Sequence, residues 1–177
     1  MKLLLTILLT LVTGGAFAQE HATPKDKWSK DLYISDEFCA TRGLKPGQTN
    51  DVLRVWNGGM NAGEKISRLV DIRYYFATQE EAVSYLESNI GRLSEGGDPV
   101  ESKIQVPGAA NLKIFDEGAA GRKMNKALGL ESHSYFFLFT VKNYVCKVFF
   151  MADKDITLGY ATDFAVEAAK RLNAVLR

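Results

Sequence analysis

The stretch from Tyr135 to Met151 constrains the fold most, because it consists of two apolar runs separated by the polar pair Lys142–Asn143. Side chains alternate between the two faces of a strand, so a strand with one face in water is polar at every second position. Here both alternating sets are mostly apolar. We therefore predict a β-hairpin, with Asn143 taking a positive φ at its turn, in the middle of a sheet. Helices would cover its faces, or a partner subunit would cover one of them.

Periodic patterns elsewhere predict the rest of a single α+β domain. Apolar residues at helical spacing indicate two main helices: one at 79–93, after the capping-box sequence Thr78–Glu81, and one at 158–176. Ser35 followed by two acids indicates a short helix that Gly43 would end. Further strands are predicted at 66–76, 103–106 and 112–115. The predicted fold is a mainly antiparallel sheet of about four to six strands packed with two main helices.

The strand at 66–76 has one mixed face and one apolar face. The apolar face consists of Ile66, Val70, Ile72, Tyr74 and Phe76, with Arg68 as the exception. Asp71 and Arg73 lie two residues apart on the mixed face, where we expect a surface ion pair that contributes little to stability.

The amino terminus has the pattern of a signal peptide. Lys2 is followed by an apolar run at 3–12 and by Ala16-Phe17-Ala18, which predicts cleavage after Ala18. The run is too short for a membrane span, which needs about 20 apolar residues. An uncleaved anchor is the alternative. We predict a signal peptide at 1–18, a flexible leader at 19–30 and one domain at 31–177, exported to the periplasm or outside the cell and without an integral membrane span after cleavage.

Charge and cysteine content narrow the class of partners. The chain has 22 basic and 21 acidic residues, and loss of Lys2 with the signal peptide brings the two into balance. This balance offers no broad attraction to nucleic acid or to anionic membranes. The two cysteines, Cys39 and Cys146, would form a disulfide after export or remain as buried free thiols.

Two glycine-rich segments are the candidate binding loops. The longest segment predicted to be irregular, 44–65, carries Trp56 and Met60, which would contact a ligand there. Alternatively, Trp56 packs on the core. The segment 118–126 is small and basic, and its Arg122 and Lys123 would receive an anion. The alternative is a hairpin or a mobile loop with solvated lysines.

Catalytic and metal-binding motifs do not emerge from the sequence. His21 and His133 are the only histidines, and neither they nor the cysteines have zinc-site spacing, so we predict no metal and no cofactor. We predict an exported, non-enzymatic binding or accessory protein of the cell envelope, whose partner is another envelope protein or a small ligand. One alternative is a small envelope hydrolase that uses carboxylates or a free cysteine. The other is a structural homodimer.

Overall fold

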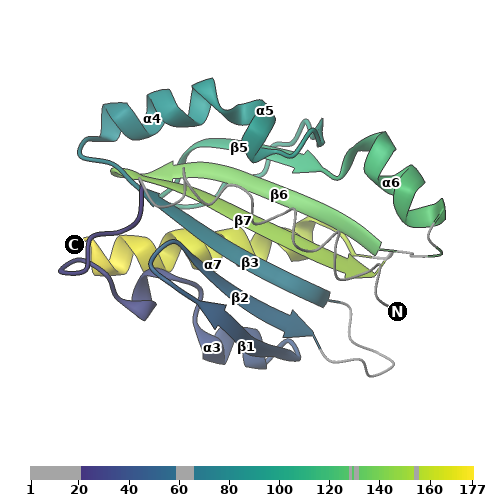
Figure 1. The fold of residues 1–177 in the computed structure, drawn as a ribbon, viewed down its shortest axis with the longest axis horizontal. Coiled ribbons are helices and arrows are strands. Elements are labelled where there is room, and N and C mark those ends of the chain that lie inside the picture. The colour runs from purple at the N-terminus through teal and green to yellow at the C-terminus, as the bar shows by residue number, and fades with distance from the viewer. Residues whose placement is uncertain (1–20, 59–65, 128, 130–131, 154–155) are drawn as a thin grey trace.

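A computed structural model describes residues 21–58, 66–127, 129, 132–153 and 156–177 (Figure 1). Within these residues seven strands form one sheet, in the order β1-β2-β3-β7-β6-β5-β4, and every neighbouring pair is antiparallel. The strands are β1 (Leu44–Thr49), β2 (Leu53–Gly58), β3 (Ile66–Tyr75), β4 (Asp98–Pro99), β5 (Ala110–Asp116), β6 (Ser132–Val141) and β7 (Tyr144–Asp153). The predicted signal peptide and Met60 lie outside the described residues.

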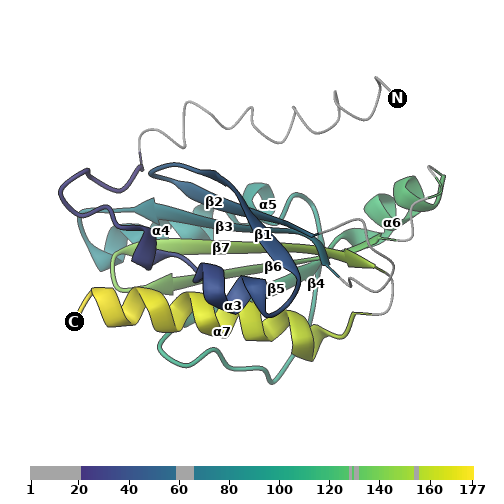
Figure 2. The same ribbon diagram turned by 90° about the horizontal axis from the view of Figure 1, so that it is seen from below.

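Helices pack on both faces of the sheet. They are η1 (Lys30–Leu32), α3 (Asp36–Ala40), α4 (Gln79–Ser88), α5 (Ile90–Leu93), α6 (Gly118–Ala127) and α7 (Leu158–Val175). Figure 2 shows the sheet between α7 and α3 on one side and α4 and α5 on the other. The predicted α+β class and antiparallel sheet are confirmed. The sheet has seven strands rather than four to six, because the segment expected to be irregular supplies β1 and β2.

The predicted hairpin is β6 and β7, near the middle of the sheet. The α7 face of β6 includes the fully buried Phe137 and Phe139, and the other face includes the fully buried Leu138. The positive φ at the turn falls on Lys142, at 50°, and not on Asn143 as predicted. Asn143 instead holds the end of β3: its Nδ2 donates to the carbonyl of Phe76 at 2.7 Å, and its carbonyl accepts from the Phe76 amide at 3.0 Å.

The predicted helix starts are confirmed by their hydrogen bonds. Thr78 and Glu81 form both bonds of a capping box at the start of α4. The Oγ of Ser35 accepts from the Phe38 amide at 3.1 Å at the start of α3. The helix predicted at 79–93 is divided, since α4 ends at Ser88 and the chain turns at Asn89 before α5.

The faces of β3 are the reverse of the prediction. Leu69, Asp71 and Arg73 are fully buried toward α7, whereas Val70 and Ile72 are only half-buried on the other face. A register shift against β7 between Ile66 and Arg68 changes the alternation there, so that Ile66 is also buried. Asp71 and Arg73 therefore form a core ion pair, at 2.8 Å, and not the expected surface pair.

The segment at 21–29, within the predicted flexible leader, makes defined contacts with the sheet. The His21 carbonyl accepts from the Tyr75 amide at 2.8 Å, and the His21 ring lies 4.4 Å from that of Phe76. Thr23 is buried, and its amide donates to the Asp51 carbonyl at 3.2 Å. These contacts fix the start of the described chain at the end of the sheet that carries the β6–β7 turn.

Candidate functional site

Trp56 lies in β2 and not on a loop. Its side chain is fully buried, and its Nε1 donates to the Asp36 Oδ1 at 2.9 Å. The Asp36 Oδ2 also accepts from the Arg54 guanidinium, whose plane lies near the Trp56 ring. Trp56 thus joins α3 to the sheet, a position that favours the packing interpretation over ligand contact.

Arg122 and Lys123 lie on α6, a helix where the sequence suggested a loop. The Arg122 Nη1 donates to the Asp116 Oδ2 at 2.7 Å, and its Nη2 reaches the Asp98 Oδ2 at 3.4 Å. The hydrogen bond that Arg122 donates to Asp116 raises the pKa of Arg122, so the guanidinium is engaged by carboxylates and is not a free anion receptor. Lys123 is exposed.

The structure does not bring the two predicted loops into one site. The end of β2 and α6 lie toward the same end of the sheet, but β3, β7 and β6 separate β2 from β5 (Figure 1). Four strand spacings of about 4.8 Å separate β2 from β5, which places the two strands about 19 Å apart. One small ligand cannot contact both.

His133 was not predicted to take part in a site, and it stacks on Tyr135 near α6, with ring centroids 4.5 Å apart. Partial burial lowers the pKa of His133, which favours its neutral form. Among the described residues, no group of three or more His, Cys, Asp and Glu side chains is placed to hold a metal ion. We treat this stack as packing at the end of the sheet.

Both cysteines are buried free thiols in the structure: Cys39 on α3 and Cys146 on β7. Burial raises the pKa of Cys146 to about 11 and raises that of Cys39 further. A buried thiol with a raised pKa is a poor nucleophile, which weighs against the thiol-hydrolase interpretation. A Cys39–Cys146 disulfide stays a prediction for the oxidised protein.

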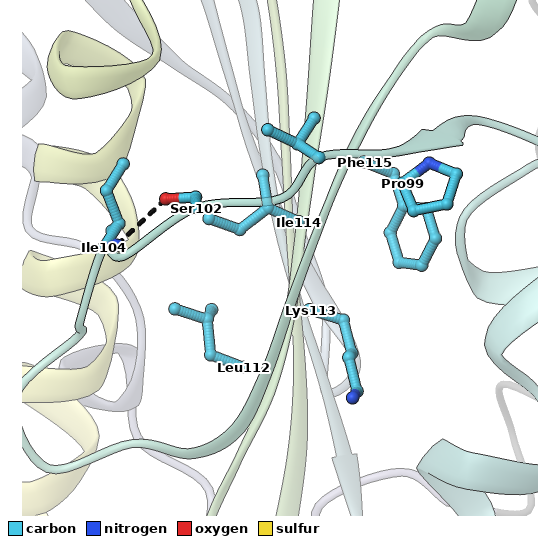
Figure 3. A pocket seen from close by; sticks show the side chains of 8 residues that line it. Pro99, Ser102, Ile104, Leu112, Lys113, Ile114 and Phe115 are labelled. Carbon is cyan, nitrogen blue, oxygen red and sulfur yellow. Dashed lines mark hydrogen bonds between the residues drawn. The ribbon is translucent and has the colours of Figure 1, made fainter.

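A shallow apolar groove lies along the outer edge of β5, and we call it the β5 groove. It has a volume of about 160 Å³ and is lined by Pro99, Val100, Ser102, Ile104, Leu112, Lys113, Ile114 and Phe115. A cavity of roughly 150 Å³ holds a benzene ring, so the groove has room for one apolar side chain. Figure 3 shows the Ile104, Leu112 and Ile114 side chains beside the same space, between β5 and the segment at 100–104.

The groove exists because β4 is short. Asp98 and Pro99 pair with β5, and the Val100 amide then donates to the Ile114 carbonyl at 2.8 Å. Beyond this bond the chain leaves the sheet. The Ser102 Oγ accepts from the Ile104 amide at 2.9 Å in the turn that directs the chain away from β5. The strand predicted at 103–106 is part of this departing segment. Backbone groups alternate in direction along a strand, so the Leu112 carbonyl points away from β6, toward an edge that has no β4 partner among the described residues. The register shift between Ala110 and Lys113, where Asn111 has a φ of 54°, interrupts the alternation before the Leu112 amide.

The chain shares its fold with a solved extracellular protein. No protein-family model matches it, and neither does any curated protein. It overlaps a structure from Bacteroides thetaiotaomicron VPI-5482 over 70% of this chain and 40% of that chain, at 8% identity and a TM-score of 0.40, too loosely to support an argument. The extracellular domain of PknH from Mycobacterium tuberculosis overlaps 88% of this chain and 97% of that chain, at 12% identity and a TM-score of 0.54. The chain is thus similar to that extracellular domain in fold.

Proposed function

We propose that this protein is an exported, non-enzymatic accessory domain that binds an extended segment of another envelope protein in the β5 groove. The single observation that carries the proposal is a strand edge of β5 that, among the described residues, has no β4 partner past Val100 and lies beside the groove. The signal-peptide pattern at 1–18 and the similarity in fold to an extracellular domain support the export part of the proposal.

An extended segment fits this edge better than a compact small molecule. The segment would continue the β4–β5 ladder past Val100 by donating to the Leu112 carbonyl, as peptides do when they add a strand to a sheet. Main-chain bonds supply affinity in this mode, and a pocket for alternate side chains supplies specificity. One apolar side chain of the segment would enter the space beside Ile104, Leu112 and Ile114.

Charge at the groove favours an acidic neighbour for that apolar side chain. Lys113 is exposed beside the groove, and Lys103 is exposed on the departing segment. Glu101 is also exposed there, so the preference is modest. We expect the bound segment to carry one acid near its apolar residue, with a contribution of at most about 1 kcal/mol.

The test uses nitrogen-15-labelled exported protein and a short, blocked peptide of alternating valine and threonine. We expect chemical-shift changes at the amides of Leu112 and Lys113, largest at Lys113, whose amide shares a peptide unit with the Leu112 carbonyl. A control peptide of the same sequence, N-methylated on the edge that would face β5, should not bind because it cannot donate to the strand.

Two substitutions sharpen the test. Ile104→Trp fills the groove and should weaken peptide binding about tenfold or more, because the apolar side chain of the peptide then loses a burial worth about 1.5–3 kcal/mol and each 1.4 kcal/mol is a factor of ten. Lys123→Trp adds the same side chain on α6 and should leave binding unchanged. Equal binding of the N-methylated peptide, or shifts confined to another edge such as β1, would overturn the proposal.

A further inference from the structure

The sheet face that carries α4 and α5 is covered unevenly. The two helices pack on β5, β6 and the start of β7, where Val145 is fully buried. Figure 1 shows them along the β5 side of the sheet, away from β2 and most of β3. In the described part of the chain, no helix combines the length and the apolar character that crossing a membrane requires.

The pairing registers of β2, β3 and β7 set out the side chains of the remaining part of this face in three rows. Residues directly opposite each other on paired strands point to the same face. The rows are Leu53, Ile72, Lys147; Val55, Val70, Phe149; and Asn57, Arg68, Met151. We call these residues the open face. Val55 is buried, and the other apolar members are half-buried: Leu53, Val70, Ile72, Phe149 and Met151.

The open face is apolar at its centre and basic at one end. Its last row carries Arg68, whose Nε is buried and has no hydrogen-bond partner among the described residues. The neighbouring strand β1 adds the exposed Lys45 opposite Asn57. Lys147, at the other end, is already paired with Glu95 at 2.5 Å. Of the described acids, none forms an ion pair with Lys45 or Arg68.

The backbone of the open face is occupied by the sheet itself. β2 lies between β1 and β3, β3 between β2 and β7, and β7 between β3 and β6, so an extended segment cannot add a strand there. A helix is the element that packs on such a face. The two spacings from β2 to β7, about 4.8 Å each, match a helix diameter of about 10–12 Å. The three rows extend about 13 Å along the strands, which suits apolar residues at i, i+4 and i+7.

We propose that the open face is a docking surface for an amphipathic helix of a second protein, with an acidic residue beside its apolar stripe. The helix would lie next to α4, at the boundary where the Tyr74 and Tyr85 rings are 5.7 Å apart. Its acid would reach Arg68 and Lys45, and this complementarity of charge would fix which way the helix lies. The surface goes beyond the proposed β5 groove, from which β6 separates it.

The test uses the exported protein with labelled Ile, Leu and Val methyl groups. The probe is a blocked peptide held helical by a lactam bridge, with leucines at i, i+4 and i+7 and one glutamate beside them. We expect chemical-shift changes at the methyl groups of Leu53, Val70 and Ile72. A peptide of the same composition in scrambled order, which has no apolar stripe, should leave them unchanged. Concentration-dependent shifts at these methyl groups without peptide, with sedimentation as a dimer, would assign the open face to a second copy and overturn the proposal.

Two substitutions separate the charged contact from the apolar one. Arg68→Gln should weaken binding of the glutamate peptide about tenfold, because a hydrogen bond between charged groups is lost, and should not change binding of a peptide with glutamine in that place. Val70→Thr keeps the branched shape and should weaken both peptides about fourfold, because one buried methyl is lost. Lys170→Gln, on α7 at the opposite face, is the matched control and should bind as the unchanged protein does.

Three results would overturn the proposal. They are equal binding of the scrambled peptide, an equal loss for the glutamate and glutamine peptides in Arg68→Gln, and shifts confined to surfaces other than the open face.

Discussion

Two Asp–Arg pairs of this protein have nearly the same geometry and opposite surroundings. Arg73 donates to Asp71 at 2.8 Å, and both side chains are fully buried. Arg122 donates to Asp116 at 2.7 Å, with side chains 43% and 23% exposed. The attraction between two charges depends on the medium as much as on their separation. The comparison shows that the contact distance of an ion pair does not measure its contribution to the stability of the folded protein.

The buried pair also connects three parts of the fold. The Asp71 Oδ2 accepts from the Ile34 amide at 3.0 Å, and the Arg73 Nη2 reaches the Ala168 carbonyl on α7 at 3.3 Å. Three polar atoms of the pair, the Asp71 Oδ1 and the Arg73 Nε and Nη1, have no hydrogen-bond partner among the described residues. Burying the pair therefore costs free energy, and burying one of the two charges without its partner costs more.

The largest expected effect is from Arg73→Met, which leaves the Asp71 carboxylate buried without its cation. We expect the free energy of unfolding at neutral pH to fall by about 3–5 kcal/mol, measured by urea denaturation. The double variant Asp71→Leu, Arg73→Met removes both charges and should recover most of the loss. A loss below about 1 kcal/mol in the single variant would contradict the burial of this pair.

The next largest effect is a pH dependence of the free energy of unfolding. Of the two pairs, we expect it from Asp71–Arg73 and not from Asp116–Arg122. Burial raises the pKa of Asp71 to about 6, although Arg73 and the Ile34 amide oppose the rise. The folded state then binds this proton more tightly than the unfolded state, whose Asp pKa is about 3.9. Protonation of Asp71 therefore stabilises the folded state at low pH. This stabilisation, of up to about 3 kcal/mol, is lost as pH rises from about 4 to about 6.

Asp71→Asn is the matched control for this pH dependence, because it lacks the titrating group. Subtracting its unfolding free energy from that of the unchanged protein at each pH isolates the Asp71 contribution. A difference that rises with pH over this window would mean that Arg73 stabilises the carboxylate more than burial destabilises it.

The smallest effect is expected at the exposed pair. Arg122→Ala should lower the free energy of unfolding by less than about 1 kcal/mol, because solvent and salt screen a surface pair. Its neighbour Lys123→Ala provides a baseline for truncating an exposed α6 side chain. If Arg122→Ala costs as much as Arg73→Met, exposure is not the variable that separates the two pairs.

Local signals in the sequence were sufficient for several elements. The hairpin, the Thr78–Glu81 capping box, the Ser35 cap and the α7 stripe all depend on residues close in the chain, and the structure has each of them. The candidate site is harder to predict from the sequence. The sequence marks Trp56 as a large aromatic residue beside glycines, but its place in the structure depends on a hydrogen bond to Asp36, twenty positions away.

The β5 groove could not be found from the sequence, since no motif marks where β4 stops. Its lining comes from two segments that meet only in the sheet, 99–104 and 112–115.

The sequence by itself determined the class of fold, because alternation of apolar residues and helix caps act over a few residues. Tertiary structure alone decided which face of β3 is buried. The apolar side chains of Val70 and Ile72 favoured one face, yet α7, through Ala168, and the segment around Ile34 close over the other. The physical reason is that a strand's pattern reports the character of each face, whereas burial depends on which distant elements pack there, and at β3 those elements supply bonds to a charged pair.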